Sequence, residues 1–408
     1  MSNATTLSGL RYRLEPYPGQ ARWLRQAAGA CRFVHNLALA YREVAWLAAK
    51  SAGATGIGAN LGYVHQCTVL TDLRQQYPWL QQCPVAALRG GLQNLDRAFD
   101  RFFAGQGGYP KFQRRGEDDS INFYDAGGIA VSGDWVRLPG LGWLRFRQHR
   151  PFQGQIRNVS LTLEGPHWYI SFTVAGSFTL PNAGAAPVGI DCGVDKPLVL
   201  STGEVISCPV ATPKEHKRLI WLQRQAARRV KGSERQQRTY AKMAKLKRHL
   251  ARRRKDATHK ATTRIATTFS LVAIEDLHLK GMTASAKGTL AEPGRNVRAK
   301  AGLNRALLAR AHGDFRRMLT YKCERSGAKL VAVHPAYTSQ TCSRCQHRAV
   351  ENRKSQAVFH CVNCGLEINA DLNAAINIRE AGSAPPAQGG SGLGPADELR
   401  TRPRARAA

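Results

Sequence analysis

Residues 361–375 read CVNCGLEINADLNAA, and this stretch joins a pair of cysteines to the start of a predicted helix. The CxxC pair suggests a metal ligand set, and Asp371 follows Cys364 by seven residues. Aspartate is common at helix starts because its carboxylate accepts hydrogen bonds from backbone N–H groups that lack a helical partner. Asp371 is therefore either a helix cap or part of a functional site, and carboxylates elsewhere in the chain must decide between the two.

A second CxxC pair lies upstream, with fifteen residues between the two pairs. This is the spacing of a four-thiolate zinc ribbon, in which each CxxC turn directs two sulfurs at one tetrahedral ion. A single CxxC could be a redox pair, but two at this spacing favour zinc. Four thiolates leave no open coordination position, so we expect one structural Zn²⁺. Its predicted ligands are Cys342, Cys345, Cys361 and Cys364.

The charge of the chain is unusual for a protein of 408 residues, a length that allows two to four domains. It contains 60 Lys and Arg against 28 Asp and Glu, which gives a formal net charge of +32. A solvated surface usually mixes both signs, whereas a large positive excess favours a polyanionic partner, most often nucleic acid. The first residues do not resemble a signal peptide, and no long apolar run predicts a membrane span. We therefore expect a cytoplasmic, nucleoid-associated protein with reduced cysteines.

The most basic segment is 213–264, which holds 19 Lys and Arg and three acidic residues. Its apolar residues repeat at helical spacing on both sides of the break KGS at 231–233, which predicts a helical hairpin. A charge run is often only a solvated face, but the shortage of acids favours contact with phosphates. Candidate nucleic-acid contacts are Arg252, Arg253 and Arg254 here and Lys111 in the upstream motif GGYPKF.

Strand and helix patterns divide the chain into several parts. An alternating strand at the N-terminus is followed by helical periodicity and then, from about residue 104, by further alternating strands. This order predicts a multidomain α+β protein in which helices are inserted into a β domain. The expected parts are a β domain at 1–15 and 104–182, a helical domain at 16–103, an α/β domain at 183–338 and 366–381, a zinc ribbon at 339–365 and a disordered tail at 382–408.

Three carboxylates occupy related positions in the predicted α/β domain. Asp191 ends the strand in VGIDCG, Glu275 ends the continuous apolar run SLVAIED, and Asp371 opens the last helix. A further helix is expected over 303–327. Three strands, a helix, a strand, a helix, a strand and a helix follow one another in the ribonuclease H-like fold. In that fold the first and fourth strands are neighbours, and the terminal helix would bring Asp371 to Asp191 and Glu275.

Three carboxylates at one point would repel one another and raise each other's pKa unless divalent cations neutralise them. Two Mg²⁺ ions roughly 3.5–4 Å apart, held by such a cluster, are the arrangement used for in-line phosphodiester hydrolysis. Each acid alone has an ordinary explanation as a solvated strand end or a helix cap. Their joint occurrence at these positions favours a catalytic site formed by Asp191, Glu275 and Asp371.

The motifs GIDCGVDKPLVLSTGE, IEDLHLKGM, TSQTCSRC and CVNCG followed by ADLNAAINI together resemble the TnpB family. TnpB proteins are transposon-encoded RNA-guided nucleases related to compact type V CRISPR effectors. The resemblance implies a RuvC-type nuclease domain that carries Asp191, Glu275 and Asp371, and a wedge β-barrel with a helical recognition insert. It also implies a guide RNA and a double-stranded DNA target as partners. Asn369 departs from the pattern, because many relatives have another acid there.

Three functions remain open at this point. The first is a Mg²⁺-dependent, RNA-guided DNA endonuclease, in which guide pairing selects the sequence and the protein reads duplex shape and a short adjacent motif. The second is a guided DNA-binding repressor without cleavage, for which a broken triad is expected. The third is a DNA transposase, because strand transfer uses the same fold and metals. The sequence does not determine the oligomeric state, and a monomer is favoured.

Overall fold

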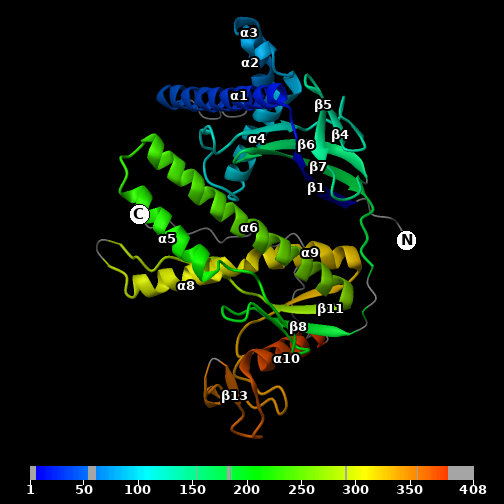
Figure 1. Cartoon of the computed structure of the whole chain (residues 1–408), viewed down its shortest axis with the longest axis vertical. Helices are drawn as coiled ribbons and strands as arrows, with labels where there is room; N and C mark the ends of the chain where they lie inside the picture. Colours follow the sequence, from blue (N-terminus) through cyan, green and yellow to red (C-terminus); the bar gives the residue numbers. More distant parts are fainter. Residues whose placement is uncertain are drawn as a thin grey trace. The chain divides into compact units, whose positions relative to one another are not determined.

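The computed structural model describes residues 6–53, 61–152, 154–181, 184, 186–289, 292–355 and 357–384. Its described residues form two compact units, one up to Phe178 and one from Thr179 onward (Figure 1). The tail expected at 382–408 lies outside the described residues from position 385, and its first residues belong to the last helix. No helix of the described ranges has the length and apolar character needed to cross a bilayer.

The first unit contains a seven-stranded antiparallel sheet in the order β2-β6-β7-β1-β5-β4-β3. The N-terminal strand β1 lies inside this sheet, paired with β7 over most of its length and with β5 at its end. Among the described residues, β2 and β3 are edge strands that do not pair with each other, so hydrogen bonds do not close the curled sheet into the expected barrel. The strands are β1 Thr6–Leu14, β2 Ser120–Phe123, β3 Ala130–Ser132, β4 Trp135–Leu138, β5 Gly142–Arg147, β6 Gln155–Glu164 and β7 His167–Gly176.

Helices between β1 and β2 share one hydrophobic core with this sheet, to which Leu24, Leu88 and Phe172 all belong. Helix α4 packs directly on β2, because a Cβ on Gly90 would lie 2.0 Å from the backbone oxygen of Asn122. The helices and the sheet thus share one core. The predicted boundary between a helical domain at 16–103 and the β domain around it stays a prediction. The helices are α1 Pro18–Ser51, α2 Tyr63–Gln76, α3 Pro78–Gln81 and α4 Val85–Phe103.

The second unit is built around a five-stranded sheet in the order β10-β9-β8-β11-β12. Strands β8, β11 and β12 are parallel, while β9 and β10 are antiparallel additions. Both faces of the parallel strands are covered, which explains their nearly continuous apolar sequences. The expected adjacency of the first and fourth strands is confirmed by the pairing of β8 with β11. The strands are β8 Pro187–Asp191, β9 Leu198–Leu200, β10 Val205–Ile206, β11 Leu271–Glu275 and β12 Lys329–Val333.

Helices lie on both faces of this sheet (Figure 1). On one face, Ile265 of α6 and Phe315 of α9 pack against Val272 of β11. On the other face, α10 lies against β8 so closely that a Cβ on Gly189 would meet the backbone oxygen of Ala375 at 2.1 Å. The helices are α5 Pro213–Ala227, α6 Glu234–Thr268, α7 Leu279–Met282, α8 Val297–Arg310, α9 His312–Ser326 and α10 Ala370–Ser383.

The observed helices test two predictions, the hairpin over 213–264 and the single helix over 303–327. The hairpin over 213–264 is confirmed as α5 and α6, and Gly232 takes a left-handed φ of 82° in the turn between them. The single helix expected over 303–327 is wrong, because Ala311 has a φ of 56° and separates α8 from α9. Helix α8 also begins at Val297, earlier than the periodicity indicated.

Candidate active site

Asp191 and Glu275 lie at the same edge of the second unit's sheet. Each is the last residue of its strand, and Ile190 of β8 stands opposite Ile274 of β11 in a parallel register. Asp191 and Glu275, the residues that follow, therefore lie at the ends of two adjacent strands. This is the carboxyl edge of the parallel strands, where ligands of open α/β sheets commonly bind.

Asp371 reaches the same region from the first turn of α10, which packs on β8 and β11. The cap of this helix is Asn369, whose Oδ1 accepts hydrogen bonds from the backbone N–H groups of Asp371 at 3.2 Å and Leu372 at 3.3 Å. The alternative that Asp371 serves only as the helix cap is therefore wrong. The position that departs from the acidic family pattern performs the capping, and the Asp371 carboxylate is left available for another role.

The pKa values of Asp191 and Glu275 are shifted by burial, and that of Asp191 also by the charges of the other acids. Burial, followed by the negative charges of Glu275 and Asp371, raises the pKa of Asp191 to about 7, against the opposing charge of Arg353. Burial also raises the pKa of Glu275, against a hydrogen bond from Thr338 that lowers it. Grouped carboxylates with raised pKa values are the environment that a divalent cation relieves. Carboxylate oxygens are also the ligands that Mg²⁺ prefers.

Thr338 and α10 fix the position of Glu275. The Thr338 hydroxyl donates to Oε1 of Glu275 at 2.7 Å, and the Thr338 carbonyl accepts from Nδ2 of Asn377 at 2.8 Å. Asn373 donates to the carbonyl of Thr341 at 2.8 Å and accepts from the backbone N–H of Ser343 at 3.0 Å. These buried asparagines thus tie α10 to the segment that carries Thr338. Sequence reasoning missed them, although two asparagines within the apolar stretch LNAAINI were a usable signal.

The four cysteines form the one group of three or more His, Cys, Asp or Glu in the described residues whose ligand atoms all lie within 4.8 Å of one another. The Sγ atoms of Cys342 and Cys364 are 3.6 Å apart, and those of Cys345 and Cys361 are 3.5 Å apart. Four sulfurs about 2.3 Å from a central ion are separated by roughly 3.8 Å, so the cluster suits a tetrahedral metal. The backbone N–H of His347 is the largest cause that lowers the pKa of the Cys345 thiol, which favours the thiolate at that position. Asp191, Glu275 and Asp371 do not form such a group in the described residues.

The ribbon around the cysteines contains the strands β13 Val358–His360 and β14 Glu367–Asn369 and the short 3-10 helix η2 Val350–Asn352. Asn352 is fully buried, donates to the carbonyls of Gln340 and His347, and accepts from the N–H of Val362. The next residue is the exposed Arg353, whose positive charge lowers the pKa of Asp191. The ribbon therefore supplies a cation to the acidic site, which spacing alone did not indicate.

The candidate nucleic-acid residues differ in their surroundings. Arg253 forms an ion pair with Glu215 at 2.8 Å and donates to the carbonyl of Val210, while Arg254 donates to the carbonyl of Ala309 at 3.2 Å. Both arginines are thus engaged within the protein, where they fix α6 to neighbouring segments. Lys111 is exposed beside a hollow of about 820 Å³ in the first unit.

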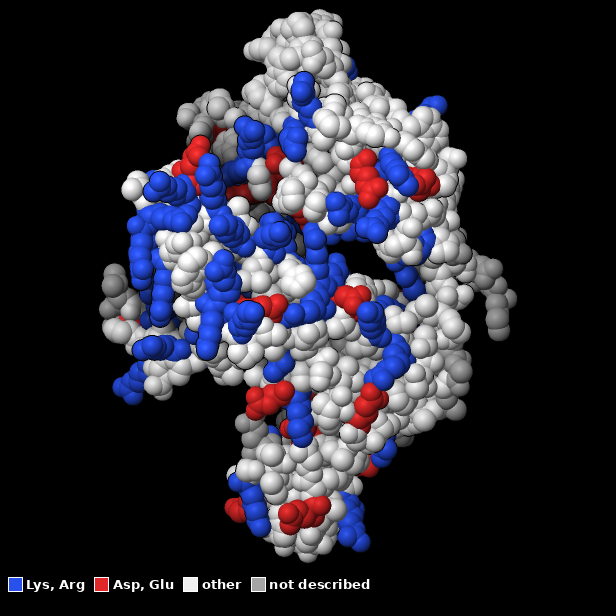
Figure 2. Space-filling view, viewed as in Figure 1, with Lys and Arg blue, Asp and Glu red and all other residues white. Residues whose placement is uncertain are grey.

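The outer face of α5 and α6 carries a dense array of Lys and Arg side chains (Figure 2). The three acids of segment 213–264 are each paired with a cation, as Glu215 with Arg253, Glu234 with Arg238 and Asp256 with Lys260. Most of the positive charge on this hairpin therefore has no compensating acid within the segment. A surface of this kind attracts phosphates.

Comparisons with known families match three segments of the chain. A family described as "Probable transposase" matches residues 177–286, which contain Asp191 and Glu275. A family described as "Cas12f1-like, TNB domain" matches residues 312–378, which contain the cysteines and Asp371. A family described as "Helix-turn-helix domain" matches residues 1–51, although residues 6–51 form one strand and one continuous helix in this structure.

Two full-length relatives and one solved structure resemble the chain. "Putative RNA-guided DNA endonuclease InsQ" of Escherichia coli (strain K12) is 37% identical over 93% of this chain and 93% of its own length. "Putative RNA-guided DNA endonuclease" of Streptomyces pristinaespiralis is 28% identical over 93% of this chain and 90% of its own length. The fold resembles a structure entitled "Cryo-EM structure of the Cas12f1-sgRNA-target DNA complex", with a TM-score of 0.54, 13% identity, and coverage of 93% of this chain and 99% of that one.

Proposed function

Because the chain belongs to the TnpB family, we propose that it is an RNA-guided DNA endonuclease that hydrolyses phosphodiester bonds of guide-matched DNA. The observation that carries the proposal is the convergence of three acids from β8, β11 and α10. The raised pKa of Asp191, caused by burial and by its two acidic neighbours, supports this convergence. Strongly perturbed carboxylates grouped at a sheet edge favour catalysis over a structural role.

The proposed role of Asp191, Glu275 and Asp371 is to hold two Mg²⁺ ions. When bound, these ions supply activation of the attacking water and stabilisation of the leaving oxygen. Thr338 donates a hydrogen bond to Oε1 of Glu275, and Oε2 is the oxygen proposed to bind metal. Asn369 caps α10 and fixes the start of the helix that carries Asp371. Arg353 brings positive charge to the place where a phosphodiester would lie, because its charge already acts on Asp191.

The second unit is proposed to be a RuvC-type, ribonuclease H-like nuclease domain. Its mixed sheet order, the parallel β8–β11 pair and the packing of α10 support this assignment. The four cysteines are proposed to bind one structural Zn²⁺, a fit supported by their sulfur separations. The hydrogen bonds of Asn373 link the first cysteine turn to α10, so the zinc ribbon would help to hold Asp371 in place.

The partners proposed are a guide RNA and double-stranded DNA, bound mainly through phosphates. The cationic face of α5 and α6 and the exposed Lys111 support this part of the proposal. The curled sheet of the first unit is proposed to act as the wedge, with α1 to α4 as its recognition part. Because Arg253 and Arg254 are engaged with protein groups, phosphate contacts are assigned to other exposed cations of the hairpin.

The test is to purify the protein with its co-expressed guide RNA and to incubate it with a plasmid that carries the matched target. We expect cleavage with Mg²⁺, none with EDTA, and none of a plasmid whose target mismatches the guide. Asp276→Asn is a matched control, because Asp276 follows Glu275 but pairs with Arg316. Guided binding without cleavage would establish the repressor alternative. Strand joining in place of hydrolysis would establish the transposase alternative.

A further inference from the structure

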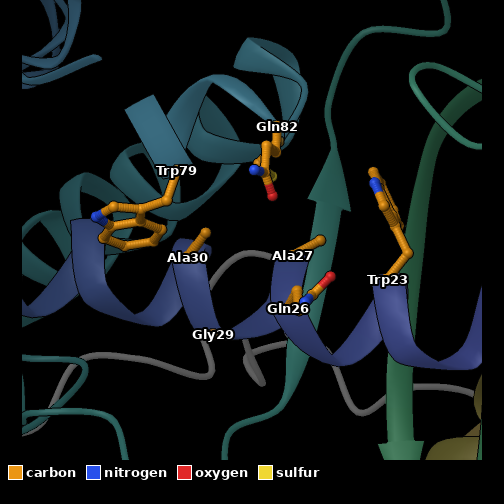
Figure 3. A pocket seen from close by; sticks show the side chains of 8 residues that line it. Trp23, Gln26, Ala27, Gly29, Ala30, Trp79 and Gln82 are labelled. Atoms are coloured by element: carbon orange, nitrogen blue, oxygen red, sulfur yellow. The ribbon is translucent and has the colours of Figure 1, made fainter. Parts of the chain in front are cut away.

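A groove in the first unit is not used by the proposed cleavage chemistry (Figure 3). It has a volume of about 360 Å³ and lies between α1 and the segment that contains α3. Its floor is made by the small buried residues Ala27, Ala30 and Cys83. This size lies at the lower end of the range for pockets that bind small organic groups.

Two tryptophans stand at the ends of the groove, Trp23 from α1 and Trp79 from α3 (Figure 3). The Trp79 residue is 44% exposed. Its ring makes an edge contact with the ring of Phe33, and the two ring centroids are 5.2 Å apart. Trp23 packs partly against the hydrophobic core, which fixes its ring as well. Rigid indole rings with open surface are suited to stacking on a flat ligand.

Two glutamines, Gln26 and Gln82, line the groove between the indoles (Figure 3). Both are exposed, and within the described part of the chain neither amide has an intramolecular hydrogen-bond partner. Each amide offers a carbonyl acceptor and two N–H donors. No residue that lines the groove is charged. The groove therefore matches a flat, uncharged group with both donors and acceptors along its edge.

The surroundings of the groove indicate which molecule carries that group. Arg22 and Arg25 are exposed and lie next to Trp23 and Gln26 along α1, where the one acidic residue is the distant Glu43. Uncharged stacking surfaces flanked by cations match a base and its attached phosphates. Resting on the nucleic-acid binding of the proposed function, we propose that this groove holds one unpaired nucleobase of a bound strand, stacked on Trp23 and read by Gln26 and Gln82.

The experiment measures binding of short single-stranded oligonucleotides to the full-length protein in EDTA, in ribose and deoxyribose forms. Each probe carries one 2-aminopurine, whose fluorescence is quenched when it stacks. Trp23→Ala should weaken binding by about tenfold and abolish the quenching, while Trp23→Phe should retain most of both. The slope of log K against log salt should stay unchanged, because stacking releases no counterions. If Trp23→Ala weakens binding of the ribose probe more, the bound strand is RNA; if it weakens binding of the deoxyribose probe more, the strand is DNA.

The matched control is Trp46→Ala, because Trp46 is 56% exposed on the same helix but lies outside the groove. Equal behaviour of the Trp23 and Trp46 variants would overturn the proposal, as would a Trp23 effect that acts only through the salt slope. Gln26→Leu gives a second test that spares the core contact of Trp23, and it should weaken binding by a few-fold. Since the assay needs no cleavage, an inactive enzyme with intact Trp23-dependent stacking would contradict only the proposed nuclease function.

Discussion

The hydroxyl of Thr338 donates a hydrogen bond to Oε1 of Glu275 at 2.7 Å. One oxygen of this carboxylate is thus already engaged by the protein, and Oε2 remains for a ligand. The Thr338 carbonyl is held in turn by Asn377 of α10, so the orientation of Glu275 depends on the same helix that carries Asp371. Two of the proposed metal ligands are therefore connected through hydrogen bonds of the fold.

Replacing Thr338 by valine tests whether this bond positions Glu275. Valine keeps the shape of the side chain but removes the donor, so the carboxylate is expected to rotate. We expect cleavage to fall by about tenfold or more and the Mg²⁺ concentration for half-maximal rate to rise, since a hydrogen bond to a charged group contributes roughly 1.5–3 kcal/mol. Thr338→Ser should restore both values. An unchanged Mg²⁺ requirement in the valine variant would show that Thr338 has only a packing role.

Asp371→Asn separates metal binding from helix stability. Asn369 already caps α10, so the substitution should leave the melting temperature within a few degrees of the parent. Loss of the charged oxygen should abolish cleavage of matched plasmid while guide and target binding persist, because phosphate contacts are made by cations elsewhere. Asp191→Ala and Glu275→Ala should give the same separation. Cleavage at the parental rate by Asp371→Asn would remove Asp371 from the triad.

Elemental analysis tests the cysteine cluster. We expect one Zn²⁺ per chain, and Cys364→Ser should lose it, because structural zinc contributes roughly 10–16 kcal/mol of apparent binding energy in isolated fingers. The ribbon is joined to α10 through Asn373, so cleavage should fall together with the zinc content. Cys67→Ser, outside the cluster, is the control. Full activity in zinc-free protein would contradict this prediction.

Salt dependence tests the basic hairpin. The triple substitution of Lys242, Lys245 and Lys247 by Gln removes exposed cations of α6, and it should reduce the slope of log K against log salt by up to about 2.7. The comparison is Arg253→Gln, which breaks the ion pair with Glu215 and should lower the melting temperature more than it changes the slope. If the triple variant keeps the parental slope, the hairpin is a solvated surface.

The raised pKa of Asp191 predicts a pH dependence of stability in EDTA. A group whose pKa is higher in the folded protein stabilises the fold at low pH, and this contribution is lost as the pH rises through the folded value of about 7. Asp191→Asn should therefore melt at a higher temperature than the parent at pH 8. Its free energy of unfolding should be higher than that of the parent by at most about 4 kcal/mol. The difference should shrink towards pH 5, and Mg²⁺ should reduce it at pH 8. Asp276→Asn should show no such trend.

The parts of the fold that sequence predicted are those encoded by local patterns. Continuous apolar runs ending in Asp191 and Glu275 indicated adjacent buried strands, and the turn residues KGS indicated the hairpin. The left-handed backbone at Ala311 was not predictable, because alanine normally continues a helix and the nearby Gly313 lies inside α9. The open edges of the first sheet depend on long-range pairing, which alternation alone does not specify.

Some residues of the candidate site could likewise be predicted from sequence and others could not. The acids and cysteines stand out by spacing and residue type, whereas their supports depend on contacts between distant segments. Asp371 looked like a cap because aspartate and asparagine are both good caps, and only the hydrogen bonds assign that role to Asn369. Arg253 was predicted to contact phosphate, and sequence alone could not show its ion pair with Glu215, which lies 38 residues away on the other arm of the hairpin.

The position of β1 inside the first sheet has a consequence for synthesis on the ribosome. This strand is synthesised before the other strands of this sheet, and its neighbours β5 and β7 end only at Arg147 and Gly176. At roughly 5–20 residues per second, β1 waits on the order of ten seconds before both of its edges can pair. Unpaired strands with an apolar face, such as β1, promote aggregation. Early stops between β5 and β7 should therefore yield insoluble fragments, and ribosome-bound chaperones have a longer opportunity to act on β1 than on the later strands of this sheet.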